Sequence, residues 1–170
     1  MDEKKFLPGF VGRRRELAAL AVELEAARSS GRGRFVLIRG RRRVGKSWLV
    51  EEFLARHGLP NVFFTATRNA TDEDLPRFAD ALAQSSLPDD ARAQGVRFAH
   101  WEAALATAAI GAAREQPSVI VIDEFPYLEE RSDDEARAIE SMFSAAWERR
   151  LSRVPVILIL VGSDLAMMER

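Results

Sequence analysis

The chain has 170 residues, of which 47% are hydrophobic and 30% are charged, and its formal net charge is −1. This length suits one globular domain, and the composition excludes a disordered or fibrous protein. The near-zero net charge gives no general support for nucleic-acid binding, so a site for an anionic ligand must be local. The absence of cysteine excludes disulfides and thiolate chemistry, and two histidines, His57 and His100, are too few for a zinc site.

The sequence carries no signal for secretion or membrane insertion. The opening segment MDEKKFLPGF lacks the long apolar core of a signal peptide, and no apolar run reaches about 18 residues. We therefore expect a cytoplasmic protein that has no membrane partner.

The first third of the chain alternates between helical and strand patterns. Apolar residues at helical spacing predict an amphipathic helix over residues 14–28, and SSGRG ends it. The run FVLIR (residues 35–39) predicts a strand, and after a glycine-containing turn a second helix is expected to end at His57, before Gly58. The run NVFFTA (residues 61–66) predicts the second strand.

Two further helices are predicted in the middle of the chain. Thr71 is the expected N-cap of a helix that continues until Pro88, and the acidic residues after Thr71 suit the positive end of a helix. Residues 89–97 are polar and predict a loop. A stripe of apolar residues from Phe98 onwards predicts another helix, closed by Gln116 and the proline after it.

The last third contains the two most hydrophobic runs. The run VIVID (residues 119–123) is typical of a strand that is buried on both faces. Ser132 and Glu135 form a capping box for a helix whose apolar stripe includes Trp147 and which ends at Arg149 and Arg150. The run VPVILILVG (residues 154–162) predicts the last strand. Strands that alternate with helices predict one α/β domain with a mainly parallel sheet covered on both faces.

The turn after the first strand matches a phosphate-binding loop. Residues 40–47 read GRRRVGKS, which fits G-x-x-x-x-G-K-[ST] without a mismatch. Gly40 and Gly45 let the backbone approach a phosphate closely, and the N–H groups and the following helix favour negative charge. Lys46 is expected to reach the β- and γ-phosphates, and the Ser47 hydroxyl to ligate Mg²⁺.

A pair of acidic residues follows the buried third strand. Asp123 is expected at the carboxyl end of this strand, and Glu124 comes directly after it. Because the carboxyl ends of parallel strands meet at one edge of the sheet, both residues should lie near the loop. Asp123 would hold the metal ion, and Glu124 would orient or deprotonate the attacking water.

The chain resembles the archaeal-type ATPases, which are P-loop NTPases related to the AAA+ and STAND groups. Four stretches carry the resemblance and span almost the whole chain: FVGRRRELAAL, IRGRRRVGKSWLVEEF, VIVIDEFPYL and LILVGSDLAMME. The resemblance implies a three-layer α/β/α sandwich of the ASCE type that binds ATP and Mg²⁺. Residues 1–170 would form one P-loop ATPase domain that hydrolyses ATP to switch a partner region or domain.

The resemblance also assigns residues around the nucleotide. Val11 and Gly12 fall where the amino-terminal segment of this family touches adenine. Ser163 falls where a polar residue senses the γ-phosphate or positions water, although a serine at a strand-to-helix turn is an equally good interpretation. Apart from the resemblance, Val44 within the loop and Trp48 after its serine are candidate nucleotide contacts. For Trp48 we favour the alternative that it packs under the sheet.

In this family the last strand of the chain lies between the loop strand and the strand of Asp123, and a further strand flanks the loop strand. That strand, a helical lid and a winged-helix or effector domain would follow Arg170, so we expect the amino-terminal part of a longer protein. Strand 34–39 should then be a sheet edge that favours self-association. Because relatives often carry winged-helix or nuclease-like domains, the resemblance makes DNA a candidate partner of the full-length protein only.

Two other functions fit the same residues. A nucleotide-dependent regulatory module with negligible turnover would combine tight binding with a very low rate. A small-molecule P-loop kinase is disfavoured because the Asp-Glu pair suits water activation. We expect Arg41, Arg42 and Arg43 to face solvent or a partner, because side chains at these variable loop positions generally point away from the phosphates.

Overall fold

The computed structural model describes residues 12–67, 73–92, 94–129 and 132–163. Within these ranges helices and strands alternate along the chain, as the sequence predicts. The elements and their bounds are α1 (Arg14–Ser30), β1 (Arg34–Gly40), α2 (Lys46–His57), β2 (Asn61–Thr65), α3 (Asp74–Ala83), η1 (Asp89–Ala91), α4 (Trp101–Ala108), β3 (Ser118–Asp123), α5 (Pro126–Glu129), α6 (Asp133–Arg149), η2 (Leu151–Arg153) and β4 (Val156–Ser163).

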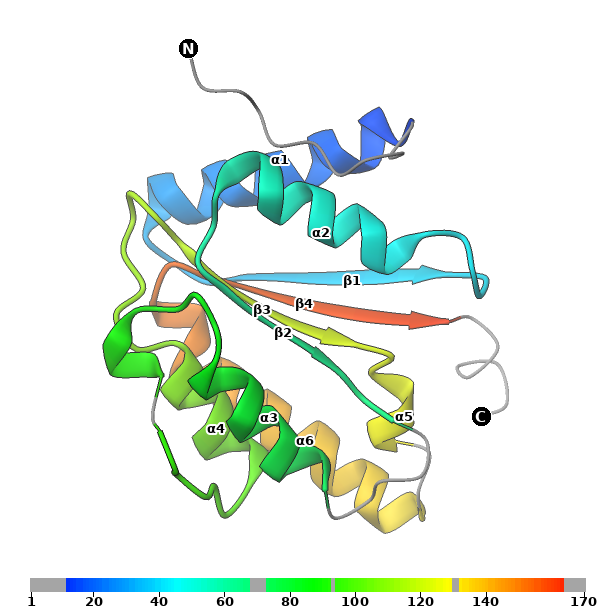
Figure 1. Cartoon of the computed structure of the whole chain (residues 1–170), viewed down its shortest axis with the longest axis vertical. Coiled ribbons are helices and arrows are strands. Elements are labelled where there is room, and N and C mark those ends of the chain that lie inside the picture. Colours follow the sequence, from blue (N-terminus) through cyan, green and yellow to red (C-terminus); the bar gives the residue numbers. More distant parts are fainter. Residues whose placement is uncertain (1–11, 68–72, 93, 130–131, 164–170) are drawn as a thin grey trace.

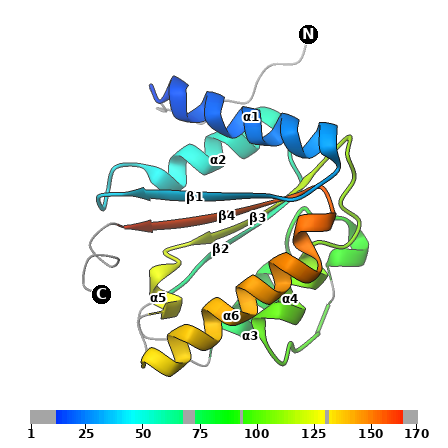
Figure 2. The ribbon, with the colours of Figure 1, turned by 180° about the vertical axis from the view of Figure 1, so that it is seen from behind.

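The four strands form one parallel sheet in the order β1–β4–β3–β2. Helices α1 and α2 cover one face, and α3, α4 and α6 cover the other (Figure 1). Figure 2 shows the same three layers from behind. The predicted α/β/α sandwich is therefore confirmed, and so is the position of the last strand between the loop strand and the strand of Asp123.

The apolar core consists of two clusters, one on each face of the sheet. Because successive side chains of a strand point to opposite faces, Val119 and Val121 pack against α1 and α2, whereas Ile120 and Ile122 pack against α3, α4 and α6. Every residue of β3 and of β4 is buried. Two central strands that are buried on both faces explain why their sequences are unbroken apolar runs.

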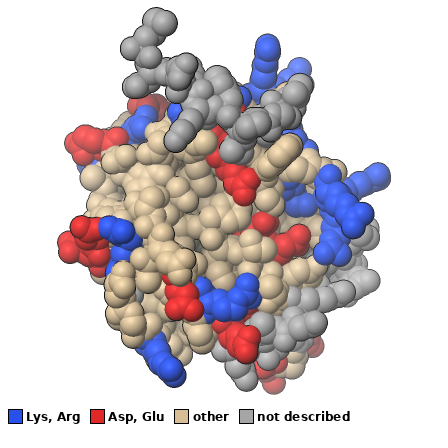
Figure 3. All heavy atoms as spheres, viewed as in Figure 1, with Lys and Arg blue, Asp and Glu red and all other residues tan. Residues whose placement is uncertain are grey.

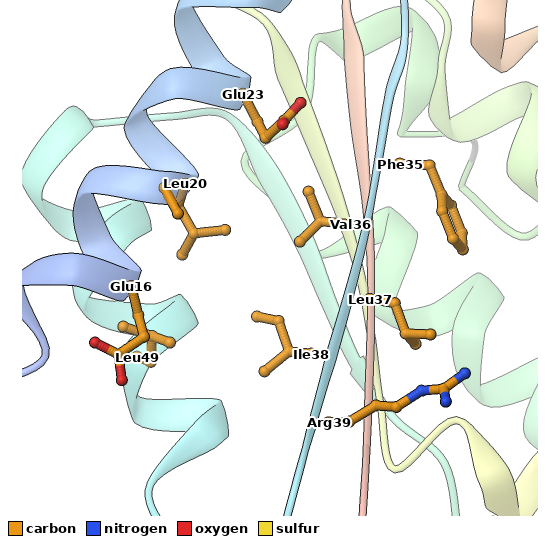
Figure 4. Close-up of a pocket in the computed structure, with 10 residues that line it drawn as sticks. Glu16, Leu20, Glu23, Phe35, Val36, Leu37, Ile38, Arg39 and Leu49 are labelled. Atoms are coloured by element: carbon orange, nitrogen blue, oxygen red, sulfur yellow. The ribbon is translucent and has the colours of Figure 1, made fainter.

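Strand β1 lies at the edge of the sheet, as expected. Figure 4 shows Val36 and Ile38 pointing toward α1 and α2, while Phe35 and Leu37 point to the opposite side. That opposite side is only partly covered, since Phe35 is 49% exposed and Leu37 is 37% exposed. Among the described residues no strand pairs with the outer side of β1, so its backbone groups there have no sheet partner.

Helices α3 and α4 are shorter than the sequence predicts. Helix α3 ends at Ala83 and not near Pro88, because the segment that follows is bonded to the start of β2: the Asn61 N–H donates to Ser86 Oγ at 2.9 Å. Residues Asp89–Ala91 form a 3₁₀ turn within the expected loop. The predicted N-cap Thr71 lies outside the described residues.

Helix α4 begins at Trp101 and ends at Ala108, so both expected ends are wrong. The His100 imidazole caps its amino end by accepting a hydrogen bond from the Ala103 N–H at 3.2 Å. Gly111, beyond the helix, lies against Pro88 and has a left-handed φ of 75°, which a continuing helix could not adopt.

The helix that precedes the last strand begins as predicted. Ser132 and Glu135 form the expected capping box at the start of α6. The apolar positions of Trp101 and Trp147 on their helices predict that both belong to the core. Trp101 is buried there, whereas Trp147 is only half-buried and contacts the exposed Phe35 edge-on. In the part of the chain that the structure describes, no helix is long and apolar enough to cross a membrane.

Candidate functional site

The glycine-rich loop connects the carboxyl end of β1 to the amino end of α2. Strand β1 ends at Gly40, and α2 begins at Lys46. Gly45 occupies the N-cap position with a φ of 78°, a left-handed conformation that glycine adopts at little cost. Arg43 also has a left-handed φ of 62°, which is uncommon for a residue with a side chain. The loop therefore turns sharply, and the first N–H groups of α2 lie at the end of the sheet where the parallel strands have their carboxyl ends.

Lys46 lies inside the curve of this loop. Its side chain is buried, and its ammonium group donates to the carbonyl oxygens of Gly40, at 2.9 Å, and of Arg41, at 3.0 Å. These two bonds hold the charge beside the backbone of the loop. A positive charge next to the N–H groups of a helix start makes the loop a site for a strongly anionic group.

The end of β3 contacts the start of α2 through side chains. The Ser47 hydroxyl donates to Asp123 Oδ2 at 2.7 Å, and Asp123 is itself buried. The other carboxylate oxygen, Oδ1, accepts a hydrogen bond from the backbone N–H of Glu124 at 3.0 Å. The structure therefore brings together the two residues that the sequence predicts as metal ligands.

This pair of residues fits a magnesium ion. Hydroxyl and carboxylate oxygens are the hard ligands that Mg²⁺ prefers, and in nucleotide sites this ion takes its other ligands from phosphates and water. Among the described residues there is no cluster of three or more His, Cys, Asp or Glu side chains that could enclose a metal ion. A cation at Ser47 and Asp123 would thus depend on the phosphates of a bound nucleotide.

Glu124 has an unusual backbone and an unpaired carboxylate oxygen. Its φ of 52° lies in the left-handed region, a strain on the order of 1–3 kcal/mol for such a residue. Its Oε2 is buried and has no hydrogen-bond partner among the described residues. A pocket of about 490 Å³ lies beside the loop, lined by Glu124, Arg42 and Arg43. This free oxygen can accept a hydrogen bond from a water molecule in the pocket.

Strand β4 fixes the turn that carries Glu124. The Phe125 N–H donates to the carbonyl oxygen of Val161 at 2.9 Å. The ring of Pro126 lies directly over Gly162, where a β-carbon would approach the ring to 2.8 Å. The absence of a side chain at Gly162 therefore permits the close approach of the turn to the sheet.

Ser163 is the last residue of β4 and is buried. In the sheet it pairs with Gly40, the first glycine of the loop. The structure thus places the predicted sensor residue beside the loop. Asp164, the alternative helix cap, lies outside the described residues.

The chain just before α1 also reaches the loop. Gly12 and Arg13 have left-handed φ values of 89° and 52°, and the Arg13 guanidinium donates to the carbonyl oxygen of Val44. Val11, the other predicted adenine contact, lies outside the described residues. Trp48 is 49% exposed, so the interpretation that it packs under the sheet is wrong.

The position of Trp48 follows from the orientation of α2. Leu49, Val50 and Phe53 occupy the face of the helix that packs on the sheet, so Trp48 is turned to the outside. Trp48 is therefore exposed at the first turn of α2, directly after Ser47 in the chain.

The three loop arginines differ in their contacts. All three are exposed, and Arg42 donates to the hydroxyl of Tyr127 in α5 at 2.7 Å. Their exposure confirms the expectation that all three face solvent, but Arg42 and Arg43 also line the pocket beside Glu124. Tyr127 was not identified as part of the site from the sequence. The one feature that could have indicated it is its position directly after Asp-Glu-Phe-Pro.

Charge distinguishes this loop from a second pocket among the described residues. In Figure 3 basic side chains gather on the side where β1 ends in Figure 1. A pocket of about 440 Å³ between α1 and β1 (Figure 4) is instead lined mostly by apolar residues. Its charged lining residues are Glu16, Glu23 and Arg39, so it offers an anion no excess of positive charge. The glycine-rich loop is therefore the place in the described structure that best suits a phosphate group.

Comparisons with known proteins agree with this geometry. The model of the AAA ATPase domain family matches residues 9–159. A search of the curated proteins found no match.

Among solved structures, the Walker-type ATPase of Pyrococcus abyssi is similar with a TM-score of 0.64 and 19% sequence identity, over 99% of this chain and 50% of that one. The ORC2 protein of Aeropyrum pernix, in ADPNP and ADP complexes, is similar with a TM-score of 0.57 and 19% identity, over 99% of this chain and 46% of that one. The Drosophila ORC bound to DNA gives a TM-score of 0.58 and 16% identity, over 98% and 42%. The chain thus spans about half the length of these structures, and the likeness shows a shared fold.

Proposed function

Because the chain belongs to the AAA ATPase domain family, we propose that its glycine-rich loop binds ATP with Mg²⁺ and that the neighbouring Asp-Glu turn hydrolyses it. The observation that carries this proposal is the 2.7 Å contact between Ser47 and Asp123. These residues are 76 positions apart in the chain, and their contact joins the loop to the acidic end of β3. A phosphate loop and a carboxylate in one place are what Mg-dependent phosphoryl transfer needs.

The loop would bind the triphosphate. Gly40, Val44 and Gly45 shape the backbone whose N–H groups receive the phosphate oxygens, and the start of α2 adds its positive dipole end. Lys46 would exchange its two carbonyl contacts for contacts with the β- and γ-phosphates of the bound nucleotide. Negative charge on the ligand thus replaces the neutral partners that hold Lys46 in the free loop.

Ser47 and Asp123 would hold the metal ion. When bound, Mg²⁺ would supply positive charge that offsets the negative charge of the phosphates. The Ser47 hydroxyl offers a direct ligand, and Asp123 lies one hydrogen bond away, so it can bind the ion directly or through water.

Glu124 would act on the attacking water. Its unpaired Oε2 borders the pocket beside the loop, where it can orient a water molecule or take its proton. Ser163, paired with Gly40 at the next strand, would help to place the same water or the γ-phosphate. The strained backbone of Glu124 supports this role, because strain of this kind collects at functional sites.

The base of the nucleotide would lie on the side of the amino-terminal segment. Arg13 ties this segment to the loop at Val44, which brings Gly12 close to the loop, and Val11 precedes it in the chain. Trp48, exposed at the start of α2, would cover part of the nucleotide.

For the whole protein we propose that hydrolysis switches a partner region or domain. One structural neighbour is an ORC assembly bound to DNA, which makes DNA a candidate partner of the whole protein. The half-covered edge of β1 also makes self-association a candidate.

The test is the release of phosphate from ATP by the protein, in Mg²⁺ and in excess chelator, with Lys46→Ala as the matched variant. The proposal predicts turnover that requires both Mg²⁺ and Lys46. Tight ATP binding with no turnover would instead identify a nucleotide-dependent binding module. Transfer of phosphate to a small molecule would identify a kinase, and equal turnover by Lys46→Ala would place the activity elsewhere.

A further inference from the structure

Between described residues, two side-chain hydrogen bonds join the region of the glycine-rich loop to the end of β3 and the turn that follows it. One is the contact of Ser47 with Asp123, which the proposed function already uses. The other is the 2.7 Å hydrogen bond that Arg42 donates to the Tyr127 hydroxyl, across 85 positions of the chain. Metal binding does not account for this second contact, because neither group is a metal ligand.

The turn between β3 and α5 is compact and strongly bonded within itself. The Tyr127 N–H donates to the Glu124 carbonyl oxygen at 2.9 Å, and the Leu128 N–H donates to the Phe125 carbonyl oxygen at 2.9 Å. Tyr127 is therefore bonded through its backbone to the residue whose carboxylate faces the pocket. A force on the Tyr127 ring is passed to the backbone of Glu124 over one short turn.

The loop end of the contact is equally constrained. Arg42 lies two residues after Gly40, where Lys46 binds the backbone, and directly before Arg43, which has a left-handed φ of 62°. A ligand that draws Lys46 away from the Gly40 and Arg41 carbonyl oxygens changes the backbone beside Arg42. The position of the Arg42 guanidinium thus depends on whether the loop holds a phosphate.

We propose that Arg42 is a positioning residue, whose hydrogen bond to Tyr127 transmits nucleotide binding at the loop to the turn that carries Glu124. The inference rests on the proposed function, because it assumes that the loop binds a triphosphate. Arg42 would thus act through a specific hydrogen bond, and not only through the positive charge that it shares with Arg41 and Arg43. Arg41, its neighbour of equal charge, has no side-chain hydrogen bond or ion pair among the described residues and serves as the control.

The experiment is backbone hydrogen exchange with and without Mg²⁺ and a non-hydrolysable ATP analogue, so that the readout does not depend on turnover. Peptides over residues 41–47 report on the loop, and peptides over residues 124–128 report on the turn. In the unmodified protein the analogue should slow exchange in both segments by about threefold or more.

The variants separate the hydrogen bond from the charge. In Tyr127→Phe and in Arg42→Gln, the analogue should still slow hydrogen exchange in the loop, but it should no longer slow exchange in the turn. In Arg41→Gln both segments should be slowed as in the unmodified protein. The double variant Tyr127→Phe with Arg42→Gln should behave like either single variant, because both remove the same bond.

Each result decides one of the two proposals. A loop that the analogue does not protect in the unmodified protein would overturn the proposed function, and this inference with it. Slower exchange in the loop would support the proposed function. If exchange in the turn is then not slowed, or is slowed equally in Tyr127→Phe, the inference alone is overturned. Steady-state turnover gives a second readout: Tyr127→Phe should lower kcat about fivefold with KM near the original value, the rate equivalent of one hydrogen bond.

Discussion

Replacing Gly162 with alanine tests how closely the turn of Glu124 is packed against strand β4. Gly162 lies within a strand, so an alanine there is not expected to meet backbone strain. Its β-carbon would, however, lie 2.8 Å from Cγ and 2.9 Å from Cδ of Pro126. Because Pro126 follows Glu124 by two residues, the clash acts directly on the proposed catalytic turn.

The size of the effect follows from these two distances. Carbon atoms normally pack about 3.5–4.0 Å apart, so Pro126 must move by about 0.6 Å or more. Overpacking of this kind costs about 1–3 kcal/mol of folding free energy. For a chain of this length each kcal/mol lowers Tm by roughly 2–4 °C, which predicts a loss of roughly 2–12 °C.

Turnover should fall more than stability alone explains. Misplacement of a reacting group by about 1 Å can reduce a rate about 100-fold, so a shift of half that size in Glu124 should lower kcat about tenfold. Among the described residues no hydrogen bond joins Pro126 itself to the glycine-rich loop, so ATP affinity should change much less than kcat and stay within about twofold. Thermal unfolding, ATP titration and steady-state turnover of Gly162→Ala measure the three quantities.

A second substitution isolates the clash. In Gly162→Ala combined with Pro126→Ala, the ring that the new methyl group would meet is gone. The double variant should therefore lose less folding free energy than the sum of the losses in the two single variants. Additive losses would show that Gly162 has another role. A Gly162→Ala protein with unchanged Tm and kcat would refute the idea that this contact holds Glu124 in place.

Two further variants test the phosphate and metal contacts. Lys46→Ala should weaken ATP binding about 100-fold, since it removes a charged hydrogen-bond donor to the phosphates, and titration calorimetry that found unchanged affinity would refute this role. Arg41→Ala, in the same loop, should weaken binding less than about fivefold, because its side chain is exposed. Ser47→Ala should remove most of the difference between the ATP affinities in Mg²⁺ and in chelator and cost about 1 kcal/mol of stability. An undiminished Mg²⁺ effect in that variant would place the metal away from Ser47 and Asp123.

The sequence predicted the sheet well because its central strands carry a strong local signal. Strands β3 and β4 are buried on both faces and therefore consist of unbroken apolar runs that few other structures explain. The start of α6 was equally clear, because Ser132 and Glu135 cap it by contacts three residues apart. Signals of this kind are complete within a few residues, so the sequence alone is enough to read them.

The ends of α3 and α4 depend on contacts that the sequence does not display. The segment after α3 is bonded to the start of β2 through Ser86 and Asn61, which are 25 positions apart. The cap of α4 is the imidazole of His100, a residue that is not among the usual N-caps. In both cases tertiary contacts override the apolar periodicity from which the helix lengths were predicted.

The candidate site shows the same division. The loop motif and the Asp-Glu pair predicted that Ser47 and Asp123 would meet, because the carboxyl ends of parallel strands share one edge of the sheet. The bond of Arg42 to Tyr127 had no such signal, since it depends on the direction of one long side chain. The outward position of Trp48 was also open, because it is decided by how α2 rotates on the sheet.

The most direct test of a site that both binds and hydrolyses ATP is the fate of one bound nucleotide. Excess protein is mixed with labelled ATP and Mg²⁺, and the bound label is analysed over time for the unmodified chain and for Glu124→Gln. If the proposed site is correct, both proteins bind ATP with similar affinity, the unmodified chain converts it to ADP and phosphate, and Glu124→Gln retains it as ATP. Conversion at the same rate in Glu124→Gln would contradict the proposed role of Glu124, and failure of both proteins to bind ATP would contradict the site itself.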